Sequence, residues 1–274
     1  MSDAYGSEEW LRTSVGHSTT DSITVRGRNL ADDLMGQMSF ADVAFLLASG
    51  RAPSEGESTL FNAVLVALAD HGLTPTALAA RLTYTGAPEA LQGALAAGLL
   101  GAGSVFLGPV EDTARFLHDI LADLPSEPDE GEVSYEALAA EAVEAAVVSG
   151  RKIPGLGHPT HKETDPRTPR IYRLAEENGL AGAHLRLLEH VAAAHRRATG
   201  KALPINGAGA AGAALADLGF PPFLTRGFAL LARAAGLIGH LAEEAERPLG
   251  MRLWKEVDRR AGGAAESGSD AADR

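Results

Sequence analysis

The stretch ESTLFNAVLVALADH, residues 57–71, decides the fold class, because its apolar side chains recur with the period of a helix. Leu60, Val64 and Leu68 are spaced four residues apart and therefore share one helix face. Comparable patterns with polar outer faces occupy residues 135–149, 183–199 and 224–242. An alternating strand pattern is confined to residues 22–25. The sequence therefore predicts an all-α fold.

Composition narrows the class of protein. The 274 residues are 45% apolar, enough for a globular protein with a sizeable core. The absence of cysteine excludes disulfides, thiolate metal sites and a cysteine nucleophile, and fits a reducing cytoplasm. The formal net charge is −12, and no basic cluster of the kind that binds nucleic acid is present. An acidic protein with an anionic substrate has to concentrate positive charge locally.

Residues 91–110 carry no charged side chain and approach the length of a membrane-spanning helix. The stretch contains five glycines and Pro109, however, and its flanking residues are acidic. We therefore expect a central buried helix there and no membrane contact. The N-terminal residues are polar and acidic, without the apolar core of a secretory signal. The expectation is a cytoplasmic protein.

The chain divides into three parts by composition. Residues 1–20 are interpreted as an N-terminal extension, residues 21–260 as one helical domain, and residues 261–274 as a disordered tail. Residues 125–132, PSEPDEGE, are interpreted as an exposed acidic loop between helices.

The segment PGLGHPTHKETDPRTPR, residues 154–170, contains four prolines and two glycines, and neither a helix nor a strand tolerates this composition. A loop so rich in histidine and arginine is either a functional site or a rigid connector whose basic residues cap a helix. His158 and His161 do not form a metal motif, because Pro159 between them breaks any helix and no Asp/Glu/His constellation of the H-E-x-x-H type accompanies them. We therefore expect no metal.

Residues 155–167, GLGHPTHKETDPR, resemble the signature loop of citrate synthases and citryl-CoA lyases, in which Gly-x-Gly-His is followed by Lys and Asp-Pro-Arg. Other segments are similar to family elements in the same order along the chain: residues 25–34, 39–54, 70–72 and 230–248. The resemblance is greatest to the lyase type, including the lyase module of ATP citrate lyase. It implies an all-α, citrate synthase-like fold with a large helical domain and a smaller helical subdomain, a homodimer, and coenzyme A bound as the thioester substrate.

The resemblance also implies roles for individual residues. His158 is expected to hydrogen-bond the oxygen on the carbon where the bond is made or broken. Substrate carboxylates are expected at His71, Arg167 and Arg233, with Arg247 reaching the site of the neighbouring subunit. The CoA-binding residues that it implies are Pro154, Gly155, Leu156, Gly157 and Lys162.

Simpler structural explanations stay open at some positions. His71 lies near the end of a helix and could interact only with its last carbonyl groups. Arg233 could belong to a buried ion pair. His240 is expected to be structural.

Two positions depart from the family pattern. Phe106 stands where citrate synthases carry a histidine that steadies the enolate, and phenylalanine there favours a lyase over a synthase. Ala208 stands where the family has an aspartate that moves the proton on the acetyl carbon, and a methyl group cannot transfer a proton. Asn206 matches the family asparagine and is a candidate donor to the enolate, while His71 is a candidate proton carrier.

The resemblance thus predicts a CoA-dependent carbon–carbon lyase. Its substrate is expected to be citryl-CoA or a related 3-hydroxy-3-carboxyacyl-CoA, and its products an acyl-CoA and a 2-oxo acid. Two alternatives stay open: a citrate synthase-type acyltransferase, and a homologue that binds CoA or carboxylates in a regulatory role. The run GAGAAG, residues 207–212, also fits a dinucleotide-binding fingerprint, but no strand precedes it. Close helix packing is the preferred interpretation of these small residues.

Overall fold

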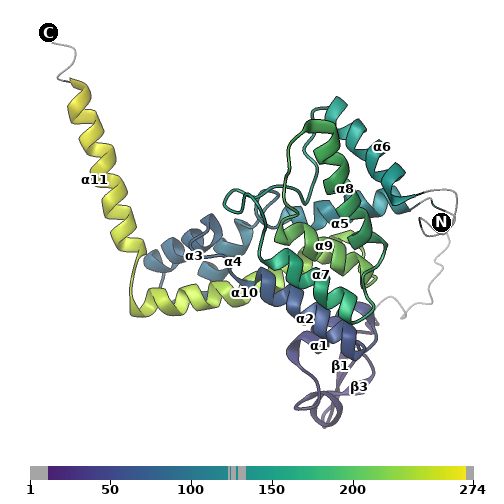
Figure 1. Ribbon diagram of the computed structural model, residues 1–274. Coiled ribbons are helices and arrows are strands. Elements are labelled where there is room, and N and C mark those ends of the chain that lie inside the picture. Colours follow the sequence, from purple (N-terminus) through teal and green to yellow (C-terminus); the bar gives the residue numbers. More distant parts are fainter. Residues whose placement is uncertain (1–11, 123, 125–127, 129–133, 270–274) are drawn as a thin grey trace, which may run out of the picture.

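The computed structural model describes residues 12–122, 124, 128 and 134–269. Within these ranges the regular structure is helical apart from one small sheet near the N-terminus (Figure 1). The helices are α1 (Phe40–Ser49), α2 (Glu55–Ala69), α3 (Pro75–Gly86), α4 (Leu91–Leu100), α5 (Gly108–Leu121), α6 (Tyr135–Val148), α7 (Arg167–Glu177), α8 (Ala183–Thr199), α9 (Gly207–Asp217), α10 (Pro222–Glu246) and α11 (Gly250–Ser269). The predicted all-α fold is confirmed.

The small sheet consists of β1 (Gly16–Ser18), β2 (Ile23–Val25) and β3 (Arg28–Asn29), and it is antiparallel in the order β1-β2-β3. A short π-helical turn, η2 (Leu30–Leu34), follows β3. The strand predicted at residues 22–25 corresponds to β2. Its partners were not predicted, because strands of three and two residues are too short to show an alternating pattern.

The predicted helices are present where the helical spacing of apolar residues continues over several turns. The pattern at residues 183–199 corresponds to α8, and those at 135–149 and 224–242 fall on α6 and α10. Helix α2 begins after Ser54, whose hydroxyl accepts from the Glu57 amide in a capping box. The helix ends at Ala69, so His71 lies in the turn that follows it.

The single buried helix predicted over residues 91–110 is wrong. Helix α4 ends at Leu100, and α5 begins only at Gly108. Gly101 and Gly103 in the connection lower the stability of a continuous helix. Pro109 lies in the first turn of α5, where its missing N–H is tolerated. None of the described helices is long and apolar enough to cross a membrane.

Helix α9 lies in the middle of the helical body and packs against α2, α5, α7, α8 and α10 (Figure 1). Its small side chains allow this close packing. A Cβ on Gly209 would lie 2.6 Å from the Cα of Gly155, and one on Gly212 would lie 2.3 Å from the carbonyl oxygen of Val110. The glycine run is therefore a packing feature, as expected, and the described strands form no βαβ unit.

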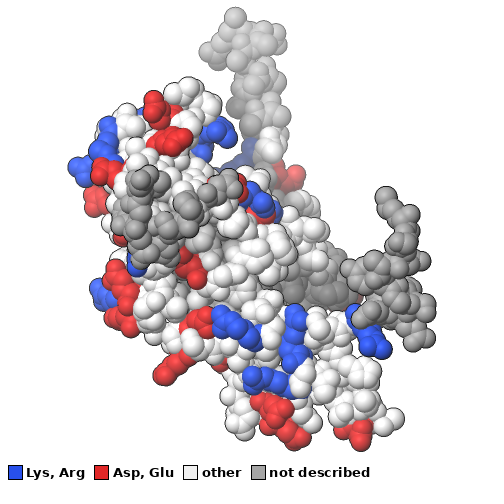
Figure 2. All heavy atoms as spheres, turned by 90° about the vertical axis from the view of Figure 1, so that its right-hand side faces the viewer, with Lys and Arg blue, Asp and Glu red and all other residues white. Residues whose placement is uncertain are grey.

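The buried apolar residues form a larger and a smaller cluster. The larger one surrounds α9, and the smaller one joins α3 and α4 to the second half of α10 through Ala77, Ala80, Ala94, Leu237 and Leu241. Helix α11 projects away from the helical body (Figure 1). On the face shown in Figure 2, acidic and basic side chains are intermixed.

Helix α11 continues to Ser269. The division into an N-terminal extension, one helical domain and a disordered tail stays a prediction. Residues 270–274 lie outside the described residues, as does most of the acidic loop predicted at 125–132.

Candidate active site

A cavity of about 730 Å³ lies between five segments of the helical body. Its walls are the α2–α3 turn, the α4–α5 connection, the loop at residues 152–160, the start of α9 and one side of α10. The cavity collects most of the residues singled out in the sequence: His71, Phe106, Pro154, Gly155, Leu156, Gly157, His158, Arg167, Asn206, Ala208 and Arg233. Residues from five separate parts of the sequence therefore meet at one site.

The loop that carries His158 is fixed by its backbone. Gly155 and Gly157 have φ angles of +83° and +80°, which side chains other than glycine rarely adopt. The Gly157 amide donates to Pro204 O at 2.8 Å, and the Asn206 amide donates to Gly155 O at 2.9 Å. The loop predicted from the composition of residues 154–170 is confirmed as far as residue 166, but the prediction is wrong for residues 167–170, which form the first turn of α7. Pro169 is tolerated there because the N–H groups of a first helical turn have no partner within the helix.

The side chain of Asn206 holds the same loop. Its Nδ2 donates to Gly157 O at 2.7 Å, and its Oδ1 accepts from the Gly209 amide at 2.8 Å as the N-cap of α9. Only one N–H of the amide remains for a ligand. Asn206 therefore joins the loop to α9 as well as lining the cavity.

The protonation state of His158 follows from its hydrogen bonds. Its Nδ1 accepts from the amides of Thr160 (3.1 Å) and His161 (3.0 Å), so the ring proton of the neutral form is on Nε2. Burial, and then the neighbouring His161, His71 and Arg167, lower the pKa of His158 against the opposing attraction of Asp165. The ring is thus a neutral N–H donor, the form that polarises a carbonyl or holds a hydroxyl oxygen.

Three histidines cluster at the cavity. One ring nitrogen from each of His71, His158 and His161 lies within 4.8 Å of the others, and the His71 and His158 ring centres are 5.2 Å apart. Sequence reasoning missed that His71 joins the pair. A metal-bound histidine normally donates its second N–H to a carboxylate or carbonyl group. The second nitrogen of His158 accepts instead, so this set does not suit a metal ion.

Arg167 is held by a buried carboxylate. Asp165 is fully buried and accepts from Arg167 Nε at 2.9 Å, from Arg167 Nη2 at 2.7 Å and from the Gly207 amide at 2.8 Å. Burial opposes its ionisation, but the contacts with Arg167 and Gly207 outweigh it and hold the pKa of Asp165 far below its usual range. Asp165 was not singled out as a site residue, although it is the first residue of the Asp-Pro-Arg signature.

Arg233 lacks such a partner. Its side chain is buried (6% exposed), yet it makes only long contacts, 3.4 Å to Thr74 Oγ1 and 3.3 Å to Leu68 O. Within the described residues, no carboxylate lies at ion-pair distance from it and its Nε has no hydrogen-bond partner. Burial lowers the pKa of Arg233, against the longer-range attraction of Asp70. The suggested structural ion pair is therefore not found.

The equally buried Arg81 provides the contrast. It is 2% exposed and pairs with Glu243 and Glu244, the latter at 2.9 Å. A buried guanidinium without a counter-charge is unfavourable, because burial removes its hydration. Arg233 thus leaves positive charge available at the cavity.

Arg247, which was expected to reach a neighbouring subunit, and Lys162 do not line the cavity of this chain. Arg247 follows α10 with 77% of its side chain exposed and pairs with Glu243 at 3.0 Å. Lys162 is exposed and donates to His158 O at 3.1 Å, but it does not line the cavity. Lys152 lines it instead, and Arg151 and Lys152 both border an adjoining cavity of about 460 Å³. Sequence reasoning missed this pair, although two adjacent cations directly before the signature loop are visible in the sequence.

The chain matches the family description "Citrate synthase, C-terminal domain" over residues 51–255. The chain belongs to the citrate synthase family. The solved structure of a citryl-CoA lyase from Hydrogenobacter thermophilus is 33% identical, with a TM-score of 0.75 over 85% of this chain and 86% of that one.

Two less similar solved structures share the fold. An ATP citrate lyase from Methanothrix soehngenii, solved with citrate and coenzyme A, is 22% identical with a TM-score of 0.72, over 86% of this chain and 39% of that one. A citrate synthase from Thermotoga maritima is 20% identical with a TM-score of 0.62, over 78% and 55%. A probable ATP-citrate synthase from Dictyostelium discoideum is 25% identical over 84% of this chain. This chain spans 38% of that relative's length.

The two positions that depart from the citrate synthase pattern both line the cavity. Phe106 lies in the α4–α5 connection, and Ala208 lies in the first turn of α9. Asp112 in α5 supplies the carboxylate among the described residues that line the cavity. No ion pair of Asp112 is found within the described part of the chain. Sequence reasoning did not consider Asp112, because it has no counterpart in the signature motifs.

Proposed function

We propose that this chain is a CoA-dependent carbon–carbon lyase that cleaves a 3-hydroxy-3-carboxyacyl-CoA into an acyl-CoA and a 2-oxo acid. In this reaction the hydroxyl proton passes to a base or to water, and the bond from the hydroxyl-bearing carbon to the thioester α-carbon breaks. Its electron pair forms the thioester enolate, which takes up one proton from an acid or from water, so that no proton is gained or lost overall. The reaction class is suggested by the 33% identical citryl-CoA lyase.

The observation that carries the proposal is that buried Arg233, which has no carboxylate partner among the described residues, lines the same cavity as His158, a neutral N–H donor. A carboxylate of the substrate supplies the counter-charge that Arg233 lacks. Arg167 and His71, on the same cavity, bind the remaining carboxylate oxygens. His158 donates from Nε2 to the oxygen on the carbon where the bond breaks.

Coenzyme A is proposed to lie along residues 152–157. Residues 154–157 all line the main cavity, and Leu156 and Gly157 also line its neighbour. Arg151 and Lys152 border the second cavity and offer positive charge to the phosphate groups of the nucleotide. Lys162, named from the family resemblance, has a weaker claim because it points to the backbone of its own loop.

Proton transfer at the α-carbon is the unusual part of this site. Ala208 has no proton to exchange, and Phe106 cannot carry the charge of the enolate oxygen. We propose that Asp112 or an ordered water carries the proton. Turnover of citryl-CoA is then slow, and the preferred substrate has a different acyl group.

The same two apolar residues favour a second candidate function. A homologue that retains the carboxylate and CoA sites but lacks an acid at position 208 could act as a binding or regulatory protein. The acyltransferase direction, catalysed by citrate synthases, requires the same proton transfer and is equally weakened. A homodimer in which Arg247 reaches the partner's site, and a cytoplasmic location, remain predictions.

A coupled assay for oxaloacetate and acyl-CoA release from citryl-CoA, together with calorimetric titration of CoA and oxaloacetate, tests the proposal. Slow release with binding of both ligands supports a lyase of altered substrate. Binding without any release supports the regulatory candidate. Failure to bind either ligand contradicts both.

A further inference from the structure

His71 reaches the cavity from a turn and not from a helix. It lies between α2 and α3, its side chain is exposed, and no hydrogen bond to its ring is found among the described residues. A histidine that has to meet a carboxylate needs a defined position. The position of His71 therefore depends on what holds the backbone of residues 68–74.

One face of α10 holds that backbone. Arg233, Gly236 and His240 are three and four residues apart, so they lie along the same side of the helix. Arg233 donates to Leu68 O and Thr74 Oγ1, at the two ends of the turn. A Cβ on Gly236 would lie 2.0 Å from Ala69 O, so the turn rests directly on the helix backbone. His240 contacts the residue next to His71.

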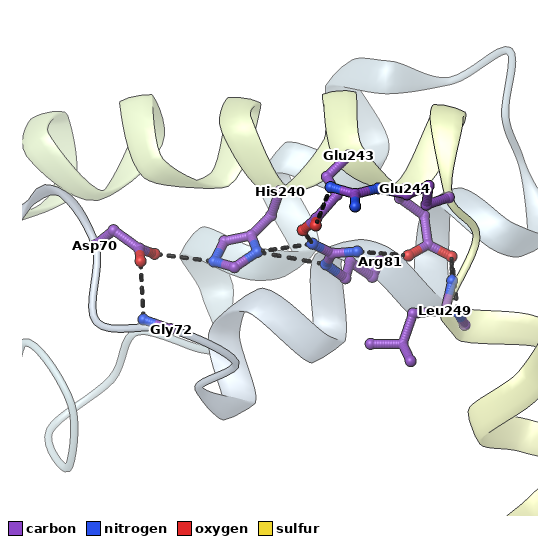
Figure 3. A network of polar contacts seen from close by, with 9 residues as sticks. Asp70, Gly72, Arg81, His240, Glu243, Glu244 and Leu249 are labelled. Carbon is purple, nitrogen blue, oxygen red and sulfur yellow. Dashed lines mark hydrogen bonds and ion pairs between the residues drawn. The ribbon is translucent and has the colours of Figure 1, made fainter.

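His240 contacts the turn through Asp70. Its Nε2 lies 2.9 Å from Asp70 Oδ1, while Asp70 Oδ2 accepts from the Gly72 amide at 2.8 Å (Figure 3). The Asp70 carboxylate thus holds the Gly72 amide, which directly follows His71 in the chain.

Arg81 sets the tautomer of His240. Its guanidinium approaches His240 Nδ1 at 3.3 Å from Nε and 3.1 Å from Nη2, so Nδ1 is the acceptor and the ring proton is on Nε2 (Figure 3). That proton is directed at Asp70. Arg81 is itself fixed by Glu243 and by the buried Glu244, which also accepts from the Leu249 and Gly250 amides. The contacts form a continuous path from the end of α10 to the turn that carries His71.

We infer that His240, oriented by Arg81 and acting through Asp70, is a positioning residue that sets the His71 side chain for binding a substrate carboxylate. The inference rests on the proposed function for the role of His71, but the geometry of the path is independent of the substrate. His240 is not among the described residues that line the cavity.

The variant His240→Leu removes the donor to Asp70 and leaves the Arg81–Glu244 pair in place. His240→Gln restores an amide donor near the former Nε2. We expect His240→Leu to weaken oxaloacetate binding about tenfold, a usual size for coupling between residues in one network, and His240→Gln to recover most of it. Thr85→Val is the matched control, because Thr85 Oγ1 contacts Arg81 O and Glu244 but not Asp70.

A double-mutant cycle distinguishes positioning from general damage. If His240 acts through His71, then His71→Ala combined with His240→Leu binds oxaloacetate no more weakly than His71→Ala alone. Additive losses overturn the inference, as does a His240→Leu protein that binds like the wild type. CoA binding should be unchanged in all variants.

A ligand-free readout separates this inference from the proposed function. In selectively histidine-labelled protein, the His71 ring signals should shift in His240→Leu and return toward wild type in His240→Gln, while Thr85→Val leaves them in place. Unchanged His71 signals in His240→Leu overturn the inference whatever the substrate is. Shifted signals in a protein that does not bind oxaloacetate support the positioning role and contradict the proposed function.

Discussion

Replacing the two buried arginines gives opposite expectations for stability, because only one of them has a carboxylate partner. Arg81→Met leaves the buried Glu244 without its guanidinium, and breaking such a pair is expected to lower the free energy of unfolding by about 3–5 kcal/mol. Arg233→Met removes a buried charge that has no counter-charge and loses only two long hydrogen bonds. We expect the free energy of unfolding to stay within about 1 kcal/mol of wild type, or to rise.

Arg233→Met is expected to weaken oxaloacetate binding strongly, although it changes the free energy of unfolding little. A carboxylate held by two charge-assisted hydrogen bonds, each worth about 1.5–3 kcal/mol, binds at least about 100-fold more weakly without them. Urea unfolding without ligand and calorimetric titration with oxaloacetate measure the two quantities on the same protein. If Arg233→Met is destabilised as much as Arg81→Met, Arg233 is structural. If it binds oxaloacetate like the wild type, the assignment of the carboxylate site is refuted.

Further outcomes follow from the same geometry. His158→Ala should lower kcat by about 10²-fold or more with little change in melting temperature, measured on the best substrate; full activity would exclude its role. Since the pKa of His158 lies below its ordinary 6.5, kcat/KM should hold as the pH falls through that value and drop only at lower pH, when Nδ1 gains a proton. The same shift means that the folded state binds fewer protons than the unfolded state just below pH 6.5, so this group lowers stability as the pH falls there. Asp112→Asn should reduce any residual turnover with oxaloacetate binding unchanged; equal turnover in initial-rate assays argues for water as the proton carrier. Ala208→Asp should raise oxaloacetate release from citryl-CoA at saturating substrate, and a wild-type kcat already in the ordinary range of about 1–10³ s⁻¹ would show that the acid is dispensable.

The sequence predicts this fold well where a helix is long and amphipathic. The α8 pattern places apolar residues on one face over many turns, and the observed bounds agree with it. The prediction of one continuous helix over residues 91–110 was wrong for the opposite reason. Its apolar residues surround the helix on all sides, so periodicity gives no sign of the break between Leu100 and Gly108.

The site is predictable where one loop carries it. His158, Gly157 and Arg167 lie within a single unusual segment, and the structure brings all three to the cavity. Contacts between distant segments were not predictable. The approach of His71 to His161 depends on how the α2–α3 turn lies against the loop before α7. The path from Arg81 to Asp70 depends on how α3 and α10 pack, and no local pattern encodes either arrangement.

The central claim is that this cavity cleaves a CoA thioester bearing a carboxylate. The most direct measurement incubates wild type and His158→Ala with a panel of 3-hydroxy-3-carboxyacyl-CoA thioesters and identifies the products by mass spectrometry. We predict that at least one thioester yields an acyl-CoA and a 2-oxo acid with the wild type and not with His158→Ala. A panel left intact by the wild type, or cleaved as fast by His158→Ala, would contradict the claim.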